Sequence, residues 1–175
     1  RRKAQKKILR PDLITISVRG NIATRIKKLH ENHFDGLIIA KAAMERLNLS
    51  FKNTYEFSFQ EMLPAASQGF IGIECISSNK DLIKMLDSIN SEKDMVLAEA
   101  ERSFVAQLNG SCLSPIAIYC REESSHVLIS AKALSQNGDK QIFKEIISSH
   151  ASINEDIRSL AKEFISKGAD KLILK

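Results

Sequence analysis

The alternation of apolar and polar residues is clearest in the second half of the chain. Three successive segments have the length and pattern of strands, and they lie at 116–121, 127–134 and 141–147. The last two flank Gln136-Asn137-Gly138-Asp139, and Asn-Gly is favoured in tight hairpin turns because both residues tolerate positive φ angles. The pattern therefore predicts an antiparallel sheet of three strands.

Helices are predicted before and after these three strands in the sequence. Apolar residues recur at helical spacing over about 91–108 and again over about 154–167, where Gly168 ends the pattern. Residues 171–174 are then left as a short strand or tail. The second half is expected to form an α+β unit.

The first half has a different pattern, in which helices and strands alternate. Helices are predicted over 1–9, 21–31, about 43–47 and 80–89, and strands over 14–18, 36–40, 55–59 and 70–76. Such alternation is typical of an α/β unit with a mainly parallel sheet. The change of architecture predicts two domains, with a boundary somewhere in 64–92.

Composition narrows the class of protein. Hydrophobic residues make up 43% and charged residues 27%, as in ordinary globular proteins, and no apolar run is long enough to span a bilayer. The three cysteines include no CxxC pair, and His30, His33, His126 and His150 lack the spacing of metal ligands, so neither disulfides nor a metal site are predicted. We expect a cytoplasmic protein with no membrane partner. Because the chain opens on Arg1-Arg2-Lys3 inside a predicted helix, we also expect it to be part of a longer protein.

Positive charge is concentrated at the start of the chain. The net charge is +5, and residues 1–28 contain many arginines and lysines but only one acid, Asp12. Such a cluster fits the phosphates of a nucleic acid, a ligand with several carboxylates, or a solvated face without a ligand. Tryptophan is absent and aromatic residues make up only 6%, which argues against stacking on nucleic-acid bases.

One local pattern within this basic region predicts an anion site. Arg19 ends a predicted strand, Gly20 lets a ligand approach the backbone, and Asn21 opens a helix whose free N–H groups favour anions. Arg25 lies one turn into that helix, and guanidinium groups bind carboxylates in a bidentate manner. The alternative is a capped turn on the surface with no ligand.

Cys112 lies in a loop of small and turn-forming residues that follows the predicted helix over 91–108. Gly110 is expected to end that helix in a left-handed conformation, and Pro115 prevents the helix from resuming. A thiol in such a loop is a candidate nucleophile or attachment point, because the backbone can be approached closely there. The alternative is a helix-terminating loop that contains a structural cysteine.

Taken in order along the chain, several motifs resemble the porphobilinogen deaminase family, also called hydroxymethylbilane synthase. Each motif alone is weak, but their order over essentially the whole chain is specific. The motifs are Arg1-Arg2-Lys3-Ala4-Gln5, Arg10-Pro11-Asp12-Leu13, Arg19-Gly20-Asn21-Ile22-Ala23-Thr24-Arg25, Phe34-Asp35-Gly36, Ile38-Ile39-Ala40, Arg46-Leu47, Leu63-Pro64-Ala65-Ala66-Ser67-Gln68-Gly69, Ile73-Glu74, Ala100-Glu101-Arg102, Gly110-Ser111-Cys112 and Pro115-Ile116.

The resemblance implies a transferase of tetrapyrrole (haem) biosynthesis. Its members condense four porphobilinogen units, with loss of ammonia, on a dipyrromethane primer from which the polypyrrole chain grows. The resemblance assigns covalent attachment of this cofactor, through a thioether, to Cys112. It further implies cofactor binding by Arg1, Arg2, Arg19, Gly20, Arg25, Gln68 and Gly69, and substrate binding by Arg19, Arg25 and Arg46.

The resemblance also implies a domain arrangement. Residues 1–66 would form an α/β domain of the periplasmic-binding-protein type, and 91–175 an α+β domain that attaches the cofactor. Residues 67–90 would hold a hinge and return to a first domain that precedes Arg1. Because the family's catalytic aspartate belongs to that first domain, no catalytic residue is assigned here, and 1–175 alone is expected to be inactive. Family members are monomers; if the first domain is truly absent, the predicted strand over 70–76 would offer an edge for association.

The sequence departs from the family pattern in two places. Ser111 stands where a second glycine is usual, and Leu113 and Ser114 replace a common Gln-Val. Lys41 adds a charge to a stretch that is usually small and apolar. A non-catalytic module that binds anions or nucleic acid through the basic start of the chain is the alternative function, but it gives Cys112 no role.

Overall fold

The computed structural model describes residues 1–31 and 34–174. The chain divides into two units: one consists of Arg1–Pro11 together with Ser58–Lys175, and the other of Asp12–Phe57. None of the helices in the described part of the chain is long and apolar enough to cross a membrane.

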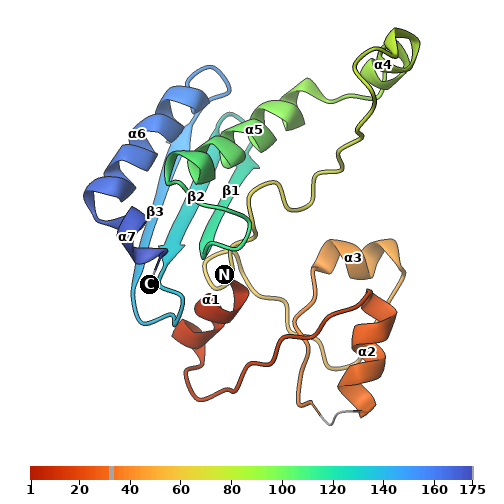
Figure 1. Ribbon diagram of the computed structural model, residues 1–175, viewed down its shortest axis with the longest axis vertical. Coiled ribbons are helices and arrows are strands. Elements are labelled where there is room, and N and C mark those ends of the chain that lie inside the picture. Colours follow the sequence, from red (N-terminus) through yellow and green to blue (C-terminus); the bar gives the residue numbers. More distant parts are fainter. Residues whose placement is uncertain (32–33, 175) are drawn as a thin grey trace. The chain divides into compact units, whose positions relative to one another are not determined.

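The larger unit is built on a three-stranded antiparallel sheet (Figure 1). Its strands are β1 (Ile116–Glu122), β2 (Val127–Leu134) and β3 (Gln141–Ser148), in the order β1-β2-β3. In the register of the sheet, Ala131 of β2 lies opposite Ile118 of β1 and Lys144 of β3. The prediction of three antiparallel strands is confirmed, with bounds within one residue of those expected.

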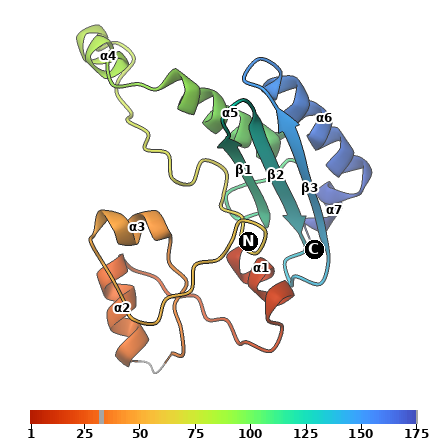
Figure 2. The same cartoon turned by 180° about the vertical axis from the view of Figure 1, so that it is seen from behind.

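Two helices, α5 (Glu92–Gln107) and α6 (Ile153–Ser166), cover one face of this sheet (Figures 1 and 2). Their apolar stripes meet in a core where the rings of Phe104 and Phe164 pack edge to face, with centroids 5.1 Å apart. The Ser91 hydroxyl accepts a hydrogen bond from the Asp94 amide at 3.3 Å and so caps the first turn of α5. Burial of the two helical stripes stabilises this side of the sheet.

The end of the chain differs from the prediction. Lys171 and Leu172 belong to a short helix, α7 (Ala169–Leu172), and not to a strand. Gly168 ends α6 in a left-handed conformation with φ +81°, and the amide of Ile173 then donates to the Ala169 carbonyl at 3.1 Å. Because Ala169 and Ile173 are both buried in the core, packing favours a helical turn here over an extended tail.

The first helix, α1 (Arg2–Leu9), packs beside the turn between β2 and β3. A side chain at Gly138 in that turn would place its Cβ 2.5 Å from the Ala4 carbonyl oxygen, so only glycine permits this approach. The φ of Gly138 is +74°, as expected for the Asn-Gly hairpin turn. The start of the chain is therefore part of the larger unit.

Phe59 and Gln60, shortly before Leu63 in the chain, pack against the second face of the sheet. The ammonium of Lys132 on β2 donates to the Gln60 carbonyl, and the ring of Phe59 stacks on Tyr119 of β1 with centroids 4.5 Å apart. The guanidinium group of Arg121 also lies over the Phe59 ring, 5.6 Å from its centroid. These contacts fix the approach to the turn that contains Gln68 and Gly69.

The remaining helices are exposed. The smaller unit contains α2 (Ile22–Glu31) and α3 (Lys41–Arg46), and α4 (Lys80–Asp87) belongs to the larger unit. The Asn79 side chain accepts from the Leu82 amide at 3.1 Å and caps α4. None of the three helices has a fully buried residue.

The expected mainly parallel sheet is not found in the described residues. We predicted strands over 14–18, 36–40, 55–59 and 70–76, but the structure describes no strand in these segments. A strand forms only where a neighbour satisfies its backbone groups, and alternation of side chains does not reveal whether that neighbour is present. Accordingly, the apolar side chains of Ile14 and Ile73 are 91% and 60% exposed.

Candidate functional site

The loop that carries Cys112 begins with a tight end to α5. The residue with the left-handed conformation is Asn109, with φ +53°, and not Gly110 as expected. Gly110 is required for another reason: a Cβ there would lie 2.4 Å from Cδ1 of Ile116 and 3.1 Å from the Val105 carbonyl oxygen. The end of α5 and the start of β1 therefore pack directly against each other at this glycine.

Cys112 occupies the corner of a turn that Ser111 and Ser114 close from both sides. The amide of Ser114 donates to the Ser111 carbonyl at 3.0 Å, and the amide of Ser111 donates to the Ser114 hydroxyl at 2.9 Å. The Ser111 hydroxyl also accepts from the Leu113 amide at 3.2 Å. Serine thus fits where the family has glycine, because the φ of Ser111 is not positive and its hydroxyl adds a bond that glycine lacks.

The three cysteines have different environments. Cys112 is exposed, Cys75 is half-buried and Cys120 is buried. Burial and the nearby Glu101 raise the pKa of the Cys120 thiol well above its usual range, so this thiol is expected to be inert. Accessibility therefore favours Cys112 as the reactive cysteine.

The turn with Gln68 and Gly69 is held by α5. The amide of Ser67 donates to Oε2 of Glu101 at 2.6 Å, and the Ser67 hydroxyl donates to the Ala98 carbonyl at 3.1 Å. Within the turn, the Gln68 side chain accepts from the Ala65 amide at 3.2 Å. Gly69 has φ +113°, and no atom lies within 4 Å of the position that its Cβ would occupy, so its backbone borders open space.

Glu101 is almost completely buried, with 1% of its surface exposed. Its second oxygen, Oε1, accepts from the Cys120 amide of β1 at 2.8 Å. Burial raises the pKa of Glu101 to about 7, although the two backbone hydrogen bonds act in the opposite direction. The resemblance placed Glu101 in a motif but gave it no role. The sequence does indicate that Glu101 is buried, because it follows Leu97 and precedes Phe104 at the spacing of the buried face of a helix.

Arg1 and Arg2 lie at the start of α1. The Nε atom of Arg1 is buried and has no hydrogen-bond partner in the described part of the chain. Burial, and then the charge of Arg2, lower the pKa of the Arg1 guanidinium. A buried donor without a partner is costly, and an anionic ligand would satisfy it. This environment fits the carboxylates of a dipyrromethane cofactor.

The smaller unit contains the predicted anion site around Gly20. Gly20 has φ +123°, and a Cβ there would lie 2.9 Å from Cγ2 of Thr24, so the turn requires glycine. Oδ1 of Asn21 accepts from both the amide and the hydroxyl of Thr24 at 2.8 Å, which confirms Asn21 as the helix cap. Nε of Arg25 donates to the Gly20 carbonyl at 2.7 Å, an arrangement that leaves a carboxylate to bind through the two Nη nitrogens. The Arg19 carbonyl accepts from Lys28 at 3.2 Å.

The charge that Lys41 adds is compensated inside the smaller unit. Its ammonium lies 2.6 Å from Oε1 of Glu56 and 3.9 Å from Oε1 of Glu45. Hydrogen bonding to Glu56 raises the pKa of Lys41. Arg46, at the end of α3, is exposed.

The predicted site residues are thus divided between the two units. The larger unit holds Arg1, Arg2, Gln68, Gly69 and Cys112, and the smaller unit holds Arg19, Gly20, Arg25 and Arg46. Within the larger unit, α5 connects two parts of the predicted site, because it holds the turn at Ser67 and leads directly into the loop of Cys112.

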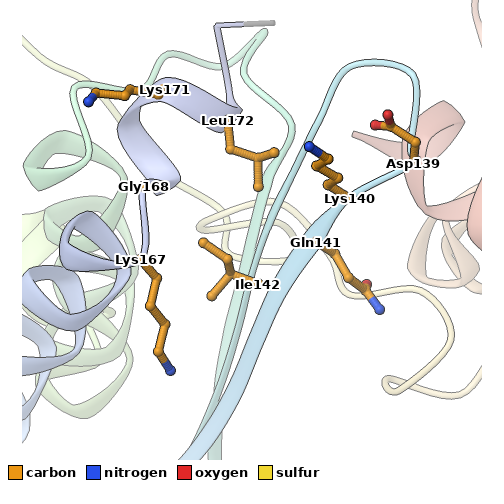
Figure 3. A pocket seen from close by; sticks show the side chains of 8 residues that line it. All are labelled: Asp139, Lys140, Gln141, Ile142, Lys167, Gly168, Lys171 and Leu172. Carbon is orange, nitrogen blue, oxygen red and sulfur yellow. The ribbon is translucent and has the colours of Figure 1, made fainter.

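A pocket in the larger unit is unrelated to these residues. It lies beside the start of β3 and the corner between α6 and α7 (Figure 3). The side chains of Lys167 and Lys171 point away from each other, while Ile142 and Leu172 form its centre. Lys167 and Lys171 therefore do not converge on one ligand position.

Metal ligands do not gather in the part of the chain that the structure describes. No group of three or more histidine, cysteine, aspartate or glutamate side chains there could hold a metal ion. His33 lies outside the described residues.

Two family models match the chain. Residues 1–84 match "Porphobilinogen deaminase, dipyromethane cofactor binding domain", and residues 95–166 match "Porphobilinogen deaminase, C-terminal domain". The chain belongs to the porphobilinogen deaminase family. Its first matched region is the domain of that family that binds the dipyrromethane cofactor. All the arginines of the predicted site lie in this region, and Cys112 lies in the region that matches the C-terminal domain.

Porphobilinogen deaminases of Campylobacter species are similar over the whole chain. The protein of Campylobacter hominis is 42% identical over 175 residues, which cover 99% of this chain and 56% of the relative. That of Campylobacter jejuni strain 81-176 is 40% identical over 177 residues, covering 100% of this chain and 57% of the relative. That of Campylobacter concisus is 38% identical, covering 99% and 56%. The chain spans little more than half the length of these relatives.

Proposed function

We propose that this chain is the part of a porphobilinogen deaminase that holds the dipyrromethane cofactor. The whole enzyme would condense four porphobilinogen units into hydroxymethylbilane with loss of ammonia, in the cytoplasm. The observation that carries the proposal is the environment of Cys112, an exposed thiol at the corner of a closed turn. Membership of the family supports it.

Cys112 is the proposed attachment residue. Its Sγ atom would form a thioether with a carbon derived from porphobilinogen as the bond between that carbon and nitrogen breaks and ammonia leaves, taking up the thiol proton. A thiolate is well suited to this substitution because sulfur is a soft nucleophile. The turn that Ser111 and Ser114 close restricts where Sγ can lie. When bound, dipyrromethane supplies the pyrrole carbon from which the polypyrrole chain grows.

The arginines are proposed to bind carboxylates. Each pyrrole unit carries two carboxylates, so negative charge accumulates as the chain grows and must be neutralised. Bidentate guanidinium pairs provide both charge and orientation, which lysine cannot do equally well. Cofactor binding is assigned to Arg1, Arg2, Arg19 and Arg25, and substrate binding to Arg19, Arg25 and Arg46. Cofactor binding is also assigned to Gly20, Gln68 and Gly69, where the ligand would approach the backbone closely.

The domain arrangement is proposed as expected from the sequence. Residues 1–66 would belong to an α/β ligand-binding domain, 67–90 to a hinge and return segment, and 91–175 to the cofactor-attachment domain. The carboxylate for the proton transfers is proposed to lie outside residues 1–175, so none of the residues named above is given a catalytic role. The enzyme is proposed to act as a monomer.

Intact mass spectrometry tests the assignment. The natural-length protein, freshly purified, should carry a covalent addition of the mass of dipyrromethane. Cys112→Ser should lose this addition, whereas Cys75→Ser, the control at another thiol, should keep it. An unmodified Cys112 in the holoenzyme, or an addition that survives Cys112→Ser, would overturn the assignment.

A further inference from the structure

Ser67 adopts a conformation that is unusual for its residue type. Its φ is +58°, in the left-handed region that non-glycine residues rarely enter. Such a conformation persists only where the surroundings determine it, and it is often found at functional turns. The next two residues are Gln68 and Gly69, both assigned above to cofactor binding.

Helix α5 supplies the groups that hold Ser67. The Ser67 amide donates to Oε2 of Glu101 at 2.6 Å, and the Ser67 hydroxyl donates to the carbonyl of Ala98 at 3.1 Å. Both hydrogen-bond donors of the strained residue are therefore bonded to a single helix. Ala66 and Phe70, on either side of the turn, pack against the hydrophobic core.

Glu101 is anchored at its other end by the sheet. Oε1 accepts from the Cys120 amide at 2.8 Å, so the two oxygens of one carboxylate connect the turn to β1. A buried carboxylate is costly, and an apolar side chain at such a position would usually serve stability as well or better. An apolar side chain at this position could not accept the hydrogen bond from the Ser67 amide, so the carboxylate has a role that packing alone cannot fill.

The consequence of this bridge appears at Gly69. Its φ is +113°, and its backbone borders open space where a Cβ would otherwise lie. Because only Gln68 separates Gly69 from Ser67, the conformation of Ser67 determines where this open stretch of backbone points.

We propose that Glu101 is a positioning residue, which holds Ser67 in its left-handed conformation and so presents the Gln68–Gly69 backbone to a carboxylate of the cofactor. The second half of this inference rests on the proposed function, whereas the first half concerns the turn alone.

Amide hydrogen exchange of the full chain tests the first half. Glutamine at position 101 offers one acceptor oxygen and turns an NH₂ group toward the second backbone donor. Glu101→Gln should therefore speed exchange at Ser67, Gln68 and Gly69 by about tenfold or more, while amides of α6 remain as protected as before. Glu99→Gln, which alters an exposed carboxylate on the same helix, should change none of these rates.

Substitution of Ser67 separates positioning from a general role in folding. Glycine adopts a left-handed conformation without strain, whereas alanine does not. Both substitutions remove the hydroxyl bond to Ala98. In a chain with Glu101 intact, Ser67→Ala should therefore speed exchange at Gln68 and Gly69 more than Ser67→Gly does, because only alanine is strained at the φ of +58°. If Glu101→Gln does not fold, Glu101→Asp replaces it, because the shorter side chain cannot reach both amides. Unchanged exchange at residues 67–69 in the Glu101 variant, or faster exchange in Ser67→Gly than in Ser67→Ala, would overturn the proposal.

The natural-length holoenzyme tests the second half. Glu101→Gln should lower the fraction of Cys112 that carries the cofactor, or raise KM for porphobilinogen by about tenfold with a smaller effect on kcat. Glu99→Gln, the control on the same helix, should leave both at their wild-type values. Wild-type occupancy and KM in the Glu101 variant would overturn this half. If wild-type protein carries no adduct at all, the proposed function falls together with this half, and the exchange experiment still decides whether Glu101 holds the turn.

Discussion

Gln5 and Leu63 form a pair of hydrogen bonds that joins two distant parts of the chain. Nε2 of Gln5 donates to the Leu63 carbonyl and Oε1 accepts from the Leu63 amide, each at 2.9 Å. Both residues are only 1% exposed. The side-chain amide thus satisfies both backbone groups of a buried residue, as a neighbouring strand would do. Arg1 and Arg2, at the start of the helix that contains Gln5, are thereby fixed to the segment that leads into the Ser67 turn.

Gln5→Leu is expected to destabilise the chain by about 3 kcal/mol, because it leaves a buried N–H and a buried C=O without partners. The free energy of unfolding in urea measures this effect. Gln136→Leu, at an exposed position of the hairpin loop, is the matched control and should be close to neutral. An equally small change in both variants would mean that the pair with Leu63 contributes nothing to stability.

Glu101 is expected to make stability depend on pH between about 4.5 and 7. Its pKa is raised from 4.5 to about 7 in the folded state, so the folded chain binds more protons than the unfolded chain in this range. The stabilisation is therefore fully present below pH 4.5 and is lost as the pH rises through 7, by up to about 3 kcal/mol.

Urea denaturation of wild type and Glu101→Gln at several pH values between 4.5 and 8 measures this loss. The difference between the two proteins isolates Glu101, because every other titratable group is present in both. Glu99→Gln should keep the wild-type slope. Parallel curves for wild type and Glu101→Gln would contradict the raised pKa.

Gly110→Ala is expected to destabilise the chain by about 2 kcal/mol, because the added Cβ would meet Ile116 and the Val105 carbonyl. The backbone carbonyl cannot move aside as a side chain can, so the loop of Cys112 should shift. Thermal unfolding provides the measurement. Gly36→Ala is the control, since nothing lies within 4 Å of its added Cβ.

The thiols are expected to react in an order set by burial. In the cofactor-free chain, a maleimide should label Cys112 first, and Cys120 should react only on unfolding because its pKa is raised and its side chain is buried. Mass spectrometry after proteolysis identifies the labelled residue. Cys112→Ser should remove the fastest phase, and rapid labelling of Cys120 in the native chain would refute the order.

Residues 1–175 alone are expected to form no hydroxymethylbilane from porphobilinogen, because no carboxylate in the chain is assigned to the proton transfers. An assay of the isolated chain, with the natural-length enzyme as positive control, checks this. Turnover by the isolated chain would place the catalytic carboxylate within these 175 residues.

The elements that depend on local sequence could be predicted well. The strands β1, β2 and β3 follow from alternation together with the Asn-Gly turn, and Asn21 follows from the preference of helix caps. The mainly parallel sheet was not found in the described residues, because a pattern such as Ile14 to Val18 shows which side chains could be buried but not what would pair with them. The helix at Lys171 and Leu172 was missed because packing of its buried neighbours decides it.

In the candidate site too, residues in local motifs could be predicted, whereas roles that depend on long-range contacts could not. Cys112 and the arginines could be named from ordered motifs, although their roles stay predictions. The roles of Gln5 and Glu101 could not, since each depends on a hydrogen bond across 58 or 34 positions of sequence. The left-handed conformation of Ser67 was missed for the same reason, because only the contacts with α5 make it favourable at a serine.

The bond between Glu101 and Cys120 also covers part of the open edge of the sheet. β1 is an edge strand, and edge strands aggregate when their outward N–H groups are open to a strand of another molecule. The outward amide of Cys120 already donates to a carboxylate of its own chain. The carboxylate that orders the turn therefore also protects this edge at Cys120 against pairing with a second copy.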